Sequence, residues 1–223
     1  MLKQRPYLAS LVLGLGLLWI KPAMAIEEPK YEVMTADAQF EVRHYVPILI
    51  AETIVEGDMD AASSKGFRLI ADFIFGNNQQ SDSDKKAKIA MTAPVTVEPQ
   101  SSKIAMTAPV TVEPQAAESS MKTAKTWRIN FVMPSQYTLA TIPKPKNNAV
   151  TLREVPSKYF IVHKYSGFNT ISRVQAKTDE AVEWAIKRSY KIIGTPQLSR
   201  YDPPWTLPMF RRNEIMIEIV APN

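Results

Sequence analysis

The sequence contains no cysteine among its 223 residues. This absence excludes a disulfide framework, a thiolate metal site and a cysteine nucleophile. It also excludes attachment to a membrane through a lipidated cysteine. Much of the usual enzyme repertoire is therefore missing from this chain.

Histidine is nearly as scarce, because His44 and His163 are the only two in the sequence. A zinc site with several imidazole ligands cannot be assembled from two histidines without carboxylate help. The sequence also lacks a glycine-rich phosphate loop, a G-x-S-x-G segment and an H-E-x-x-H segment. No catalytic constellation stands out, and the sequence predicts a protein that is not an enzyme.

The first 25 residues have the three parts of a secretory signal peptide. Lys3 and Arg5 form a short basic start, and the apolar run Leu8–Ile20 follows. Ala23-Met24-Ala25 then offers the small residues that a signal peptidase needs, so we expect cleavage before Ile26. A retained membrane anchor is the alternative, but the run is shorter than the roughly 20 apolar residues of a transmembrane helix. The predicted location is periplasmic or secreted, with no stable membrane anchor after cleavage.

Removing the signal lowers the charge of the chain. The whole sequence has 27 basic and 22 acidic residues, a formal charge of +5. Residues 1–25 hold three of the basic residues and none of the acidic ones, which leaves 24 against 22, or +2. So small a charge, without a long basic run, indicates neither a nucleic-acid surface nor a polybasic membrane patch. Residues 26–223, about 198 in number, suit a single domain.

Two stretches of the mature chain follow the same order of features. Each has a strand-like segment, a Val-Pro break, a second apolar strand, a glycine and then a helical pattern. The first helix is expected over about residues 59–75, ended by Gly76, and the second over about residues 171–190, capped by Asn169 or Thr170. The repetition suggests an internal pseudo-twofold symmetry. Paired strands around two helices predict an α+β fold with a mainly antiparallel sheet.

One segment occurs twice without a mismatch. Lys88–Gln100 is repeated as Lys103–Gln115, which indicates a recent tandem duplication. Two copies of one strand cannot stack into the continuous core of a solenoid. We expect one copy to occupy a native strand and the other to form a loop, an edge segment or a hairpin partner.

Three motifs in this chain resemble the SOUL/haem-binding protein family. They are Phe40-Glu-Val-Arg-His-Tyr45 followed by Pro47, Ile89-Ala-Met-Thr-Ala-Pro-Val95, and Pro203-Pro-Trp-Thr-Leu-Pro-Met-Phe-Arg-Arg-Asn-Glu214. Each motif is weak alone. The three lie in the expected order, however, and together with the helix that ends at Gly76 they are spread over nearly all of residues 30–221. The second copy of the middle motif, Ile104 to Val110, departs from the family pattern, which has one such segment.

The resemblance implies a distorted, mostly antiparallel eight-stranded barrel with two flanking helices and pseudo-twofold symmetry. It also implies non-covalent binding of haem or other porphyrins, without catalysis, in an open and largely apolar groove beside the first helix. The expected partner is accordingly a small hydrophobic ligand and not a nucleic acid.

His44 is the candidate ligand of the haem iron. It shares the period-two face of its strand with Phe40 and Val42, whereas Glu41 faces the opposite way. A neutral imidazole is a common axial ligand of haem iron. Some family members are thought to use a histidine at this motif and others bind haem without one. The alternative is a structural histidine bonded to the backbone.

Porphyrin binding also needs cations for the propionates and apolar walls for the macrocycle. An arginine can hold a carboxylate through two parallel hydrogen bonds. The candidate cations are Lys65, Arg68 and Arg211, and the candidate walls are Phe67, Ile70, Ile74 and Phe210. For each cation the alternative is a solvated surface charge, and for each apolar residue it is plain core.

The sequence thus predicts a non-enzymatic carrier, buffer or scavenger of haem or other tetrapyrroles. A binding or sensor module for other flat hydrophobic ligands, without iron ligation, is the second hypothesis. An enzyme that modifies tetrapyrroles is the third, and it would need acid–base groups beside the groove.

Overall fold

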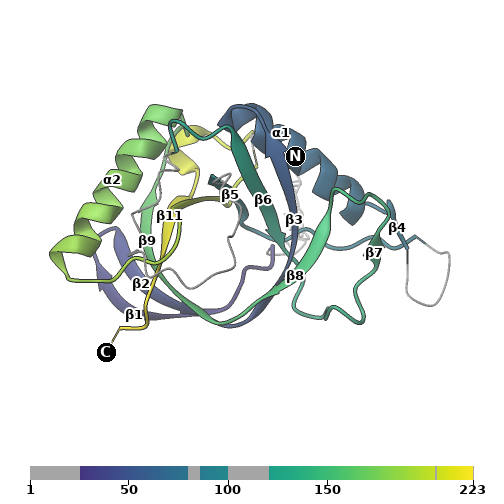
Figure 1. Cartoon of the computed structure of the whole chain (residues 1–223), viewed down its shortest axis with the longest axis horizontal. Coiled ribbons are helices and arrows are strands. Elements are labelled where there is room, and N and C mark those ends of the chain that lie inside the picture. The colour runs from purple at the N-terminus through teal and green to yellow at the C-terminus, as the bar shows by residue number, and fades with distance from the viewer. Residues whose placement is uncertain (1–25, 80–85, 100–120, 204, 223) are drawn as a thin grey trace, which may run out of the picture.

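The structure is a computed structural model that describes residues 26–79, 86–99, 121–203 and 205–222. Two helices pack against the outside of one curled antiparallel sheet (Figure 1). The helices are α1 (Met59–Ile74) and α2 (Ile171–Lys187). The strands are β1 (Tyr31–Asp37), β2 (Phe40–Tyr45), β3 (Ile48–Glu56), β4 (Asn78–Gln79), β5 (Val95–Pro99), β6 (Thr126–Val132), β7 (Lys144–Pro145), β8 (Thr151–Val155), β9 (Lys158–Tyr165), β10 (Gln197–Arg200) and β11 (Asn213–Ile219). A short 3₁₀ helix, η1, spans Pro208–Phe210.

The order of the strands shows the predicted pseudo-twofold symmetry. The nine-stranded sheet runs β1-β2-β9-β11-β10-β5-β6-β3-β8, and β4 and β7 form a small second sheet. Without β1, the order consists of two matching sets of four strands that meet where β10 pairs with β5. The α+β prediction is confirmed. The sheet has nine strands and not eight, because β1 adds an outer strand beside β2.

The same order of features precedes each helix. Gly57 and Gly167 both have positive φ, at 134° and 107°, where a residue with a Cβ would be strained. Asp58 and Thr170 then cap α1 and α2 by accepting backbone N–H groups in the first turn. The second helix ends at Lys187 and not near residue 190, because Ser189 adopts a left-handed conformation with φ of 60°.

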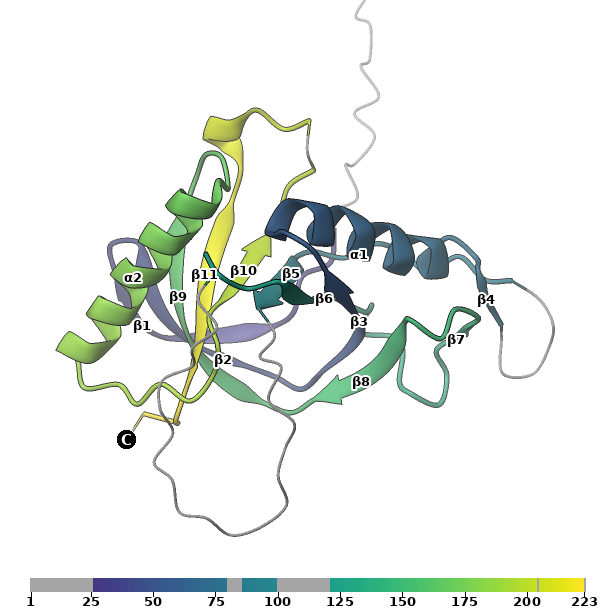
Figure 2. The ribbon, with the colours of Figure 1, turned by 45° about the horizontal axis from the view of Figure 1, so that its top comes forward.

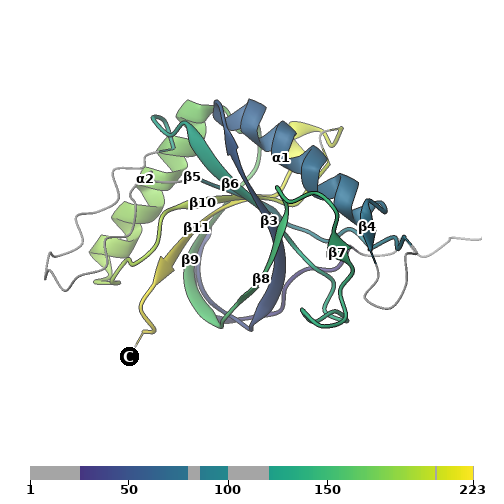
Figure 3. The same cartoon turned by 45° about the vertical axis from the view of Figure 1, so that its right-hand side comes forward.

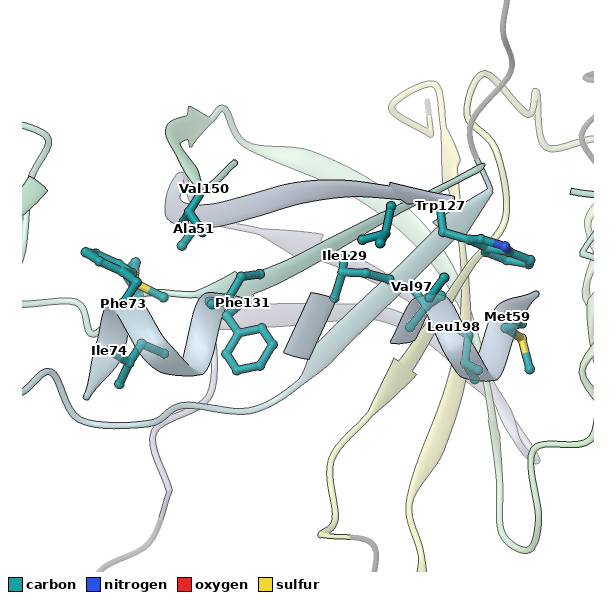
Figure 4. Close-up of a cluster of buried hydrophobic side chains, with 14 of the residues drawn as sticks. Ala51, Met59, Phe73, Ile74, Val97, Trp127, Ile129, Phe131, Val150 and Leu198 are labelled. Atoms are coloured by element: carbon teal, nitrogen blue, oxygen red, sulfur yellow. The ribbon is translucent and has the colours of Figure 1, made fainter. Parts of the chain in front are cut away.

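The main core lies between the helices and the outer face of the sheet. Figure 4 shows α1 packed against strand residues that include Ile129, Phe131 and Trp127, all fully buried or nearly so. Gly66 makes this contact close, because a Cβ built there would lie 2.4 Å from Cγ1 of Ile129. Under α2, a smaller cluster joins Val42 and Trp184.

The inner face of the curled sheet is much more polar. Figure 3 looks along the ring that the strands form, with both helices outside it. Because side chains alternate along a strand, β6 sends Trp127 and Ile129 toward α1, whereas Arg128 and Asn130 line the inside. The helices therefore complete an apolar core outside the ring, and the ring itself encloses charged groups.

Two predicted features fall outside the described residues. The expected signal peptide, residues 1–25, is one of them, and the second copy of the duplicated segment, Lys103–Gln115, is the other. The first copy supplies β5, which pairs with β6 and β10. Across the described ranges, no helix has both the length and the apolar character needed to cross a membrane.

Candidate ligand-binding site

The inside of the ring holds a buried ion pair between Arg43 of β2 and Glu214 of β11. The guanidinium nitrogens Nη1 and Nη2 donate to the two carboxylate oxygens at 2.9 and 3.0 Å. Arg43 is 1% exposed and Glu214 is fully buried. Burial alone would lower the pKa of Arg43, but its bonds to Glu214 and Tyr45 outweigh that effect and raise it. Arg212 and Tyr201 also donate to Glu214, so the buried charges are well matched.

At the mouth of the ring, most charged side chains also form ion pairs with one another. A cavity of about 170 Å³ opens there, lined by residues of β3, β5, β6, β8, β9 and β11. Arg153 donates twice to Glu52, at 3.0 and 2.8 Å, and Lys158 donates to Glu218 at 2.6 Å. Arg128 lies 3.5 Å from Glu52 and 3.6 Å from Glu98, although its Nε has no hydrogen-bond partner among the described residues. The three cations that face this opening thus lie beside three acidic groups. The inside of the ring therefore has little charge left over for a ligand.

The outer face carries a different arrangement beside α1. Phe131, Val95 and Arg200 lie in register on the neighbouring strands β6, β5 and β10. Neighbouring strands are about 4.8 Å apart, so this row spans roughly 10 Å. Phe67 of α1 packs on Phe131 with ring centroids 5.4 Å apart, and Asp60 of α1 lies beside Arg200. The row thus runs under one flank of the helix, from an aromatic end to a cationic end.

Arg200 is the unusual group in this row. Its Nε and Nη2 atoms are buried without a hydrogen-bond partner among the described residues. The closest acidic oxygen, Oδ1 of Asp60, lies 3.6 Å from Nη2. Burial lowers the pKa of Arg200, and Asp60 only partly offsets this effect. The Arg200 side chain is 28% exposed, so a carboxylate that enters from solvent could accept hydrogen bonds from these unmet donors.

A cavity of about 280 Å³ opens beside Arg200. Its lining includes Arg211, Asn213 and Phe168, which is 61% exposed, together with the carboxylates of Asp60 and Asp202. The guanidinium carbon of Arg211 lies 5.7 Å from the centre of the Phe168 ring. Two arginines and an exposed aromatic ring thus share one opening. We call the row and this opening, with residues Phe67, Val95, Phe168, Arg200, Arg211 and Asn213, the α1 rim.

The structure brings some of the predicted site residues to this rim and not others. Phe67 and Arg211 belong to it, and Lys65 and Arg68 are exposed on α1 close to Phe67 in sequence. Phe210 is 72% exposed, on the loop just before Arg211. Ile70 and Ile74 were expected as ligand walls, but both are fully buried between α1 and the sheet. They are core residues, because they lie on the side of the helix that faces the strands.

His44 lies far from the α1 rim. It pairs with Tyr159 across β2 and β9, stacks on that ring at 4.3 Å, and contacts Ser157 Oγ through Nε2 at 2.5 Å. The rim residue Asn213 pairs instead with Tyr165, six residues further along β9. At about 3.3 Å per residue, His44 is roughly 20 Å from the rim. Its apolar neighbours Phe40 and Val42 face α2, so the apolar face of β2 is not directed at a cavity.

His163 is a structural residue of the interface between β9 and α2. It is fully buried, and its Nδ1 lies 3.1 Å from the carbonyl oxygen of Lys177. Neither histidine lines the cavity inside the ring or the one beside Arg200. Within the described residues, no group of three or more His, Cys, Asp or Glu side chains is arranged to hold a metal ion.

Sequence reasoning missed Arg200, Phe168 and Asn213. A signal for Arg200 is present, because it shares a period-two face with Leu198, which is fully buried. A cation on the apolar face of a strand is costly to bury without a partner, so its position points to a binding role. Phe168 and Asn213 carry no such signal, since only the fold brings them to Arg200.

The comparison with known families shows to which family the chain belongs. The model of the family described as "SOUL heme-binding protein" matches residues 26–218. The chain belongs to the SOUL haem-binding family. Binding of haem or a related tetrapyrrole is a property of this family, whose members are generally not enzymes.

Curated relatives agree with this assignment. The chain is 29% identical to "Heme-binding protein 2" of Homo sapiens over 161 residues, which cover 69% of this chain and 66% of that protein. It is 28% identical to the protein of the same name from Mus musculus over 153 residues, covering 66% and 63%. The match thus spans slightly less than two thirds of the length of either relative.

Solved structures support the fold alone. The C-terminal domain of EcmrR superposes with a TM-score of 0.55 at 12% identity, covering 82% of this chain and 97% of that one. A structure titled as a hydrolase from Listeria innocua gives 0.51 at 10% identity, covering 84% and 94%. At such low identity these similarities carry no functional meaning.

The α1 rim of this SOUL protein fits one part of a haem group better than another. The unmet Nε and Nη2 donors of Arg200, together with the guanidinium of the neighbouring Arg211, suit the propionates. Phe168, Val95 and Phe67 offer apolar contact for a ring edge. No histidine lies at the rim to bind the iron. The opening, about 280 Å³, is near the lower limit of ligand pockets, so it suits the edge of a macrocycle and not the whole of it.

Proposed function

We propose that this protein is a non-enzymatic carrier or buffer of haem or related tetrapyrroles, and that the ligand binds at the α1 rim. The observation that carries the proposal is Arg200, a partly buried cation whose Nε and Nη2 donors are buried and unmet among the described residues, beside an exposed aromatic ring. Arg200 and Arg211 would hold the propionates. Phe168, Val95 and Phe67 would contact one edge of the macrocycle and leave much of it exposed.

An open site of this kind suits carriage more than chemistry. Haem held by its edge keeps its iron accessible, and it can pass to another protein without opening of a closed pocket. Of the two acidic residues near the rim, Asp60 is 78% exposed and Asp202 accepts a hydrogen bond from the backbone of Arg212. Neither is a buried carboxyl group held ready for acid–base chemistry.

A haem titration of residues 26–223, followed by absorbance in both iron oxidation states, tests the proposal. We expect a saturable Soret change that weakens about tenfold or more in Arg200→Ala, because charge-assisted hydrogen bonds are lost. Arg188→Ala is the matched control, since Arg188 is an exposed arginine at the end of α2. Equal affinity for Arg200→Ala and the parent protein would exclude the α1 rim.

Two ligand variants separate propionate binding from iron ligation. Haem with both propionates esterified should bind weakly, whereas metal-free protoporphyrin should bind about as well as haem.

His44→Ala should leave the haem spectrum unchanged, because His44 is remote from the rim. Loss of the spectrum in His44→Ala would instead support the prediction that His44 is the axial ligand. A haem spectrum that decays on standing with bound ligand would favour the enzyme hypothesis.

We also propose that the mature protein acts in the periplasm or outside the cell. The basic start, apolar run and Ala-x-Ala pattern of residues 1–25 support export. The test is the mass and location of the expressed full-length chain. A periplasmic product that begins at Ile26 is expected, and an uncleaved cytoplasmic product would contradict the proposal.

A further inference from the structure

The loop between β10 and β11 presents large apolar side chains to solvent. Trp205, Leu207, Met209 and Phe210 are 84%, 58%, 63% and 72% exposed. We call these four residues the apolar tip. In Figure 2 the loop projects beyond the ends of β10 and β11, at the edge of the molecule. Soluble proteins rarely expose several large apolar residues together unless the surface meets a partner.

The tip is held in place by hydrogen bonds. The backbone N–H of Gly167 donates to the carbonyl of Pro208 at 2.8 Å, and Nε of Arg211 donates to the carbonyl of Thr206 at 2.7 Å. Phe210 N–H closes the 3₁₀ turn on Leu207 at 2.9 Å. Because the tip is already ordered, little conformational entropy is lost when it binds.

Basic side chains flank the tip. Arg211 lies over the Phe168 ring, and the exposed Arg173 donates to the carbonyl of Ser166 at 3.0 Å. The two arginines are far apart in sequence, so they do not form a basic run that sequence analysis could detect. The carboxylate of the neighbouring Asp202 accepts a hydrogen bond from the backbone N–H of Arg212. A projecting apolar loop with arginines beside it complements an anionic lipid surface.

We propose that the apolar tip binds the surface of a bilayer that contains anionic phospholipids. Tryptophan and other amphipathic aromatic side chains settle at the boundary between headgroups and acyl chains. The loop projects from the molecule, and none of the four tip residues lines the cavity inside the ring or the one beside Arg200, so the tip suits insertion among lipids. None of the four tip residues lines the opening beside Arg200, so the apolar part of this surface is separate from the α1 rim, and only Arg211 belongs to both.

The tryptophans of the mature protein provide a built-in reporter. Residues 26–223 contain Trp127, Trp184 and Trp205, which are 1%, 6% and 84% exposed. Only Trp205 can change its surroundings without unfolding. We expect a blue shift of the emission when the protein meets vesicles of phosphatidylcholine with about one part in four phosphatidylglycerol, and co-sedimentation with those vesicles.

Variants locate the binding surface while keeping the reporter. Leu207→Ala/Met209→Ala should lower the partition coefficient about tenfold, because two large apolar contacts are removed. Arg173→Gln should lower it about fivefold on the anionic vesicles and hardly at all on pure phosphatidylcholine. The matched control is Ile186→Ala, which removes an apolar side chain that is 67% exposed on α2.

Several results would overturn the proposal. They are the absence of a blue shift, equal partition of the double variant and the parent, or self-association through the tip in the absence of lipid. Haem titration of the double variant keeps the two hypotheses apart. Unchanged haem affinity with lost vesicle binding supports the membrane surface whatever the fate of the α1 rim.

Discussion

Arg43 shows how one side chain can connect several elements of the fold. It lies inside the ring and bonds to Glu41, Tyr45 and Glu214. A single buried charge left without its partner is far more costly than an apolar pair in the same place. The ion pair therefore contributes more to specifying the packing of β2 against its neighbours than to net stability.

Replacing Arg43 with methionine should destabilise the protein by about 3 kcal/mol. This loss is at the lower end of the range for breaking a buried ion pair, because Glu214 still accepts hydrogen bonds from Arg212 and Tyr201. Urea unfolding measures it. In the double variant Arg43→Met/Glu214→Met the loss should be smaller than the sum of the single losses, and full additivity would contradict a coupled pair.

His163 should make stability fall at mildly acidic pH. Burial lowers its pKa below the ordinary value of 6.5, against the opposing effects of Lys177 O and Glu180. Below pH 6.5 the unfolded chain takes up a proton that the folded chain does not, so stability present above this pH is lost as the pH falls. Unfolding curves from about pH 7.5 to about pH 5 measure this loss.

The variant His163→Phe isolates the effect of this residue. It keeps a ring against Phe40, which stacks on His163 at 4.3 Å, but it has no proton to bind. Its stability should fall less than that of the parent over the same pH range. Parallel curves for the two proteins would show that groups other than His163 cause the loss.

Residue by residue, the sequence predicted the site only in part. Phe67 and Arg211 could be named, because a helical apolar stripe and an Arg-Arg pair are visible in the sequence. Ile70 and Ile74 lie on the same apolar stripe as Phe67, and nothing in their spacing reveals that α1 buries them. For His44, alternation correctly indicated which residues share its face, but it could not reveal that this face meets α2.

Among the elements, α1 and β6 have the closest contact. Gly66 allows it, because any Cβ at this position would overlap Ile129. Gly66→Ala should cost about 1–3 kcal/mol through overpacking, even though alanine favours helix more than glycine. Thermal unfolding measures the change. Ser64→Ala, on the exposed side of α1, is the control and should change stability by no more than about 0.5 kcal/mol.

The predicted elements match the observed ones closely where turn signals are strong. Glycines at 57, 76 and 167 correctly marked helix boundaries, because each adopts a positive φ. The second helix was predicted too long, and helical spacing alone would place Ile186 with Val182 on its buried face, although Ile186 is 67% exposed. Trp184 is buried there instead, stacked 5.2 Å from Phe40, a contact that only the strand below α2 explains.

For the whole molecule, the two similar halves share strands and do not form separate units. β2 of the first half pairs with β9 of the second, and β3 pairs with β8. Both halves also meet where β5 pairs with β10, and there Thr96 Oγ1 lies 3.2 Å from Ser199 Oγ. Neither half can keep its sheet when the other unfolds.

We therefore expect residues 26–223 to unfold in one cooperative transition. Far-UV circular dichroism follows the strands and helices, and near-UV circular dichroism follows buried rings such as Trp127. The two signals should change at the same urea concentration. Separate midpoints would mean that one half survives without the other.

The sequence by itself determined the order of the elements, the α+β class, the internal symmetry and the family. These properties depend on local patterns, namely alternation, helical spacing, turn glycines and short motifs, which neighbouring residues suffice to display. The tertiary structure alone decided which face of the curled sheet the helices cover, and therefore that Arg43 lies inside the ring. It also decided that Arg200, Phe168 and Arg211 meet at one opening, because the pairing of β11 with β9 and β10 sets these distances and no local pattern encodes them.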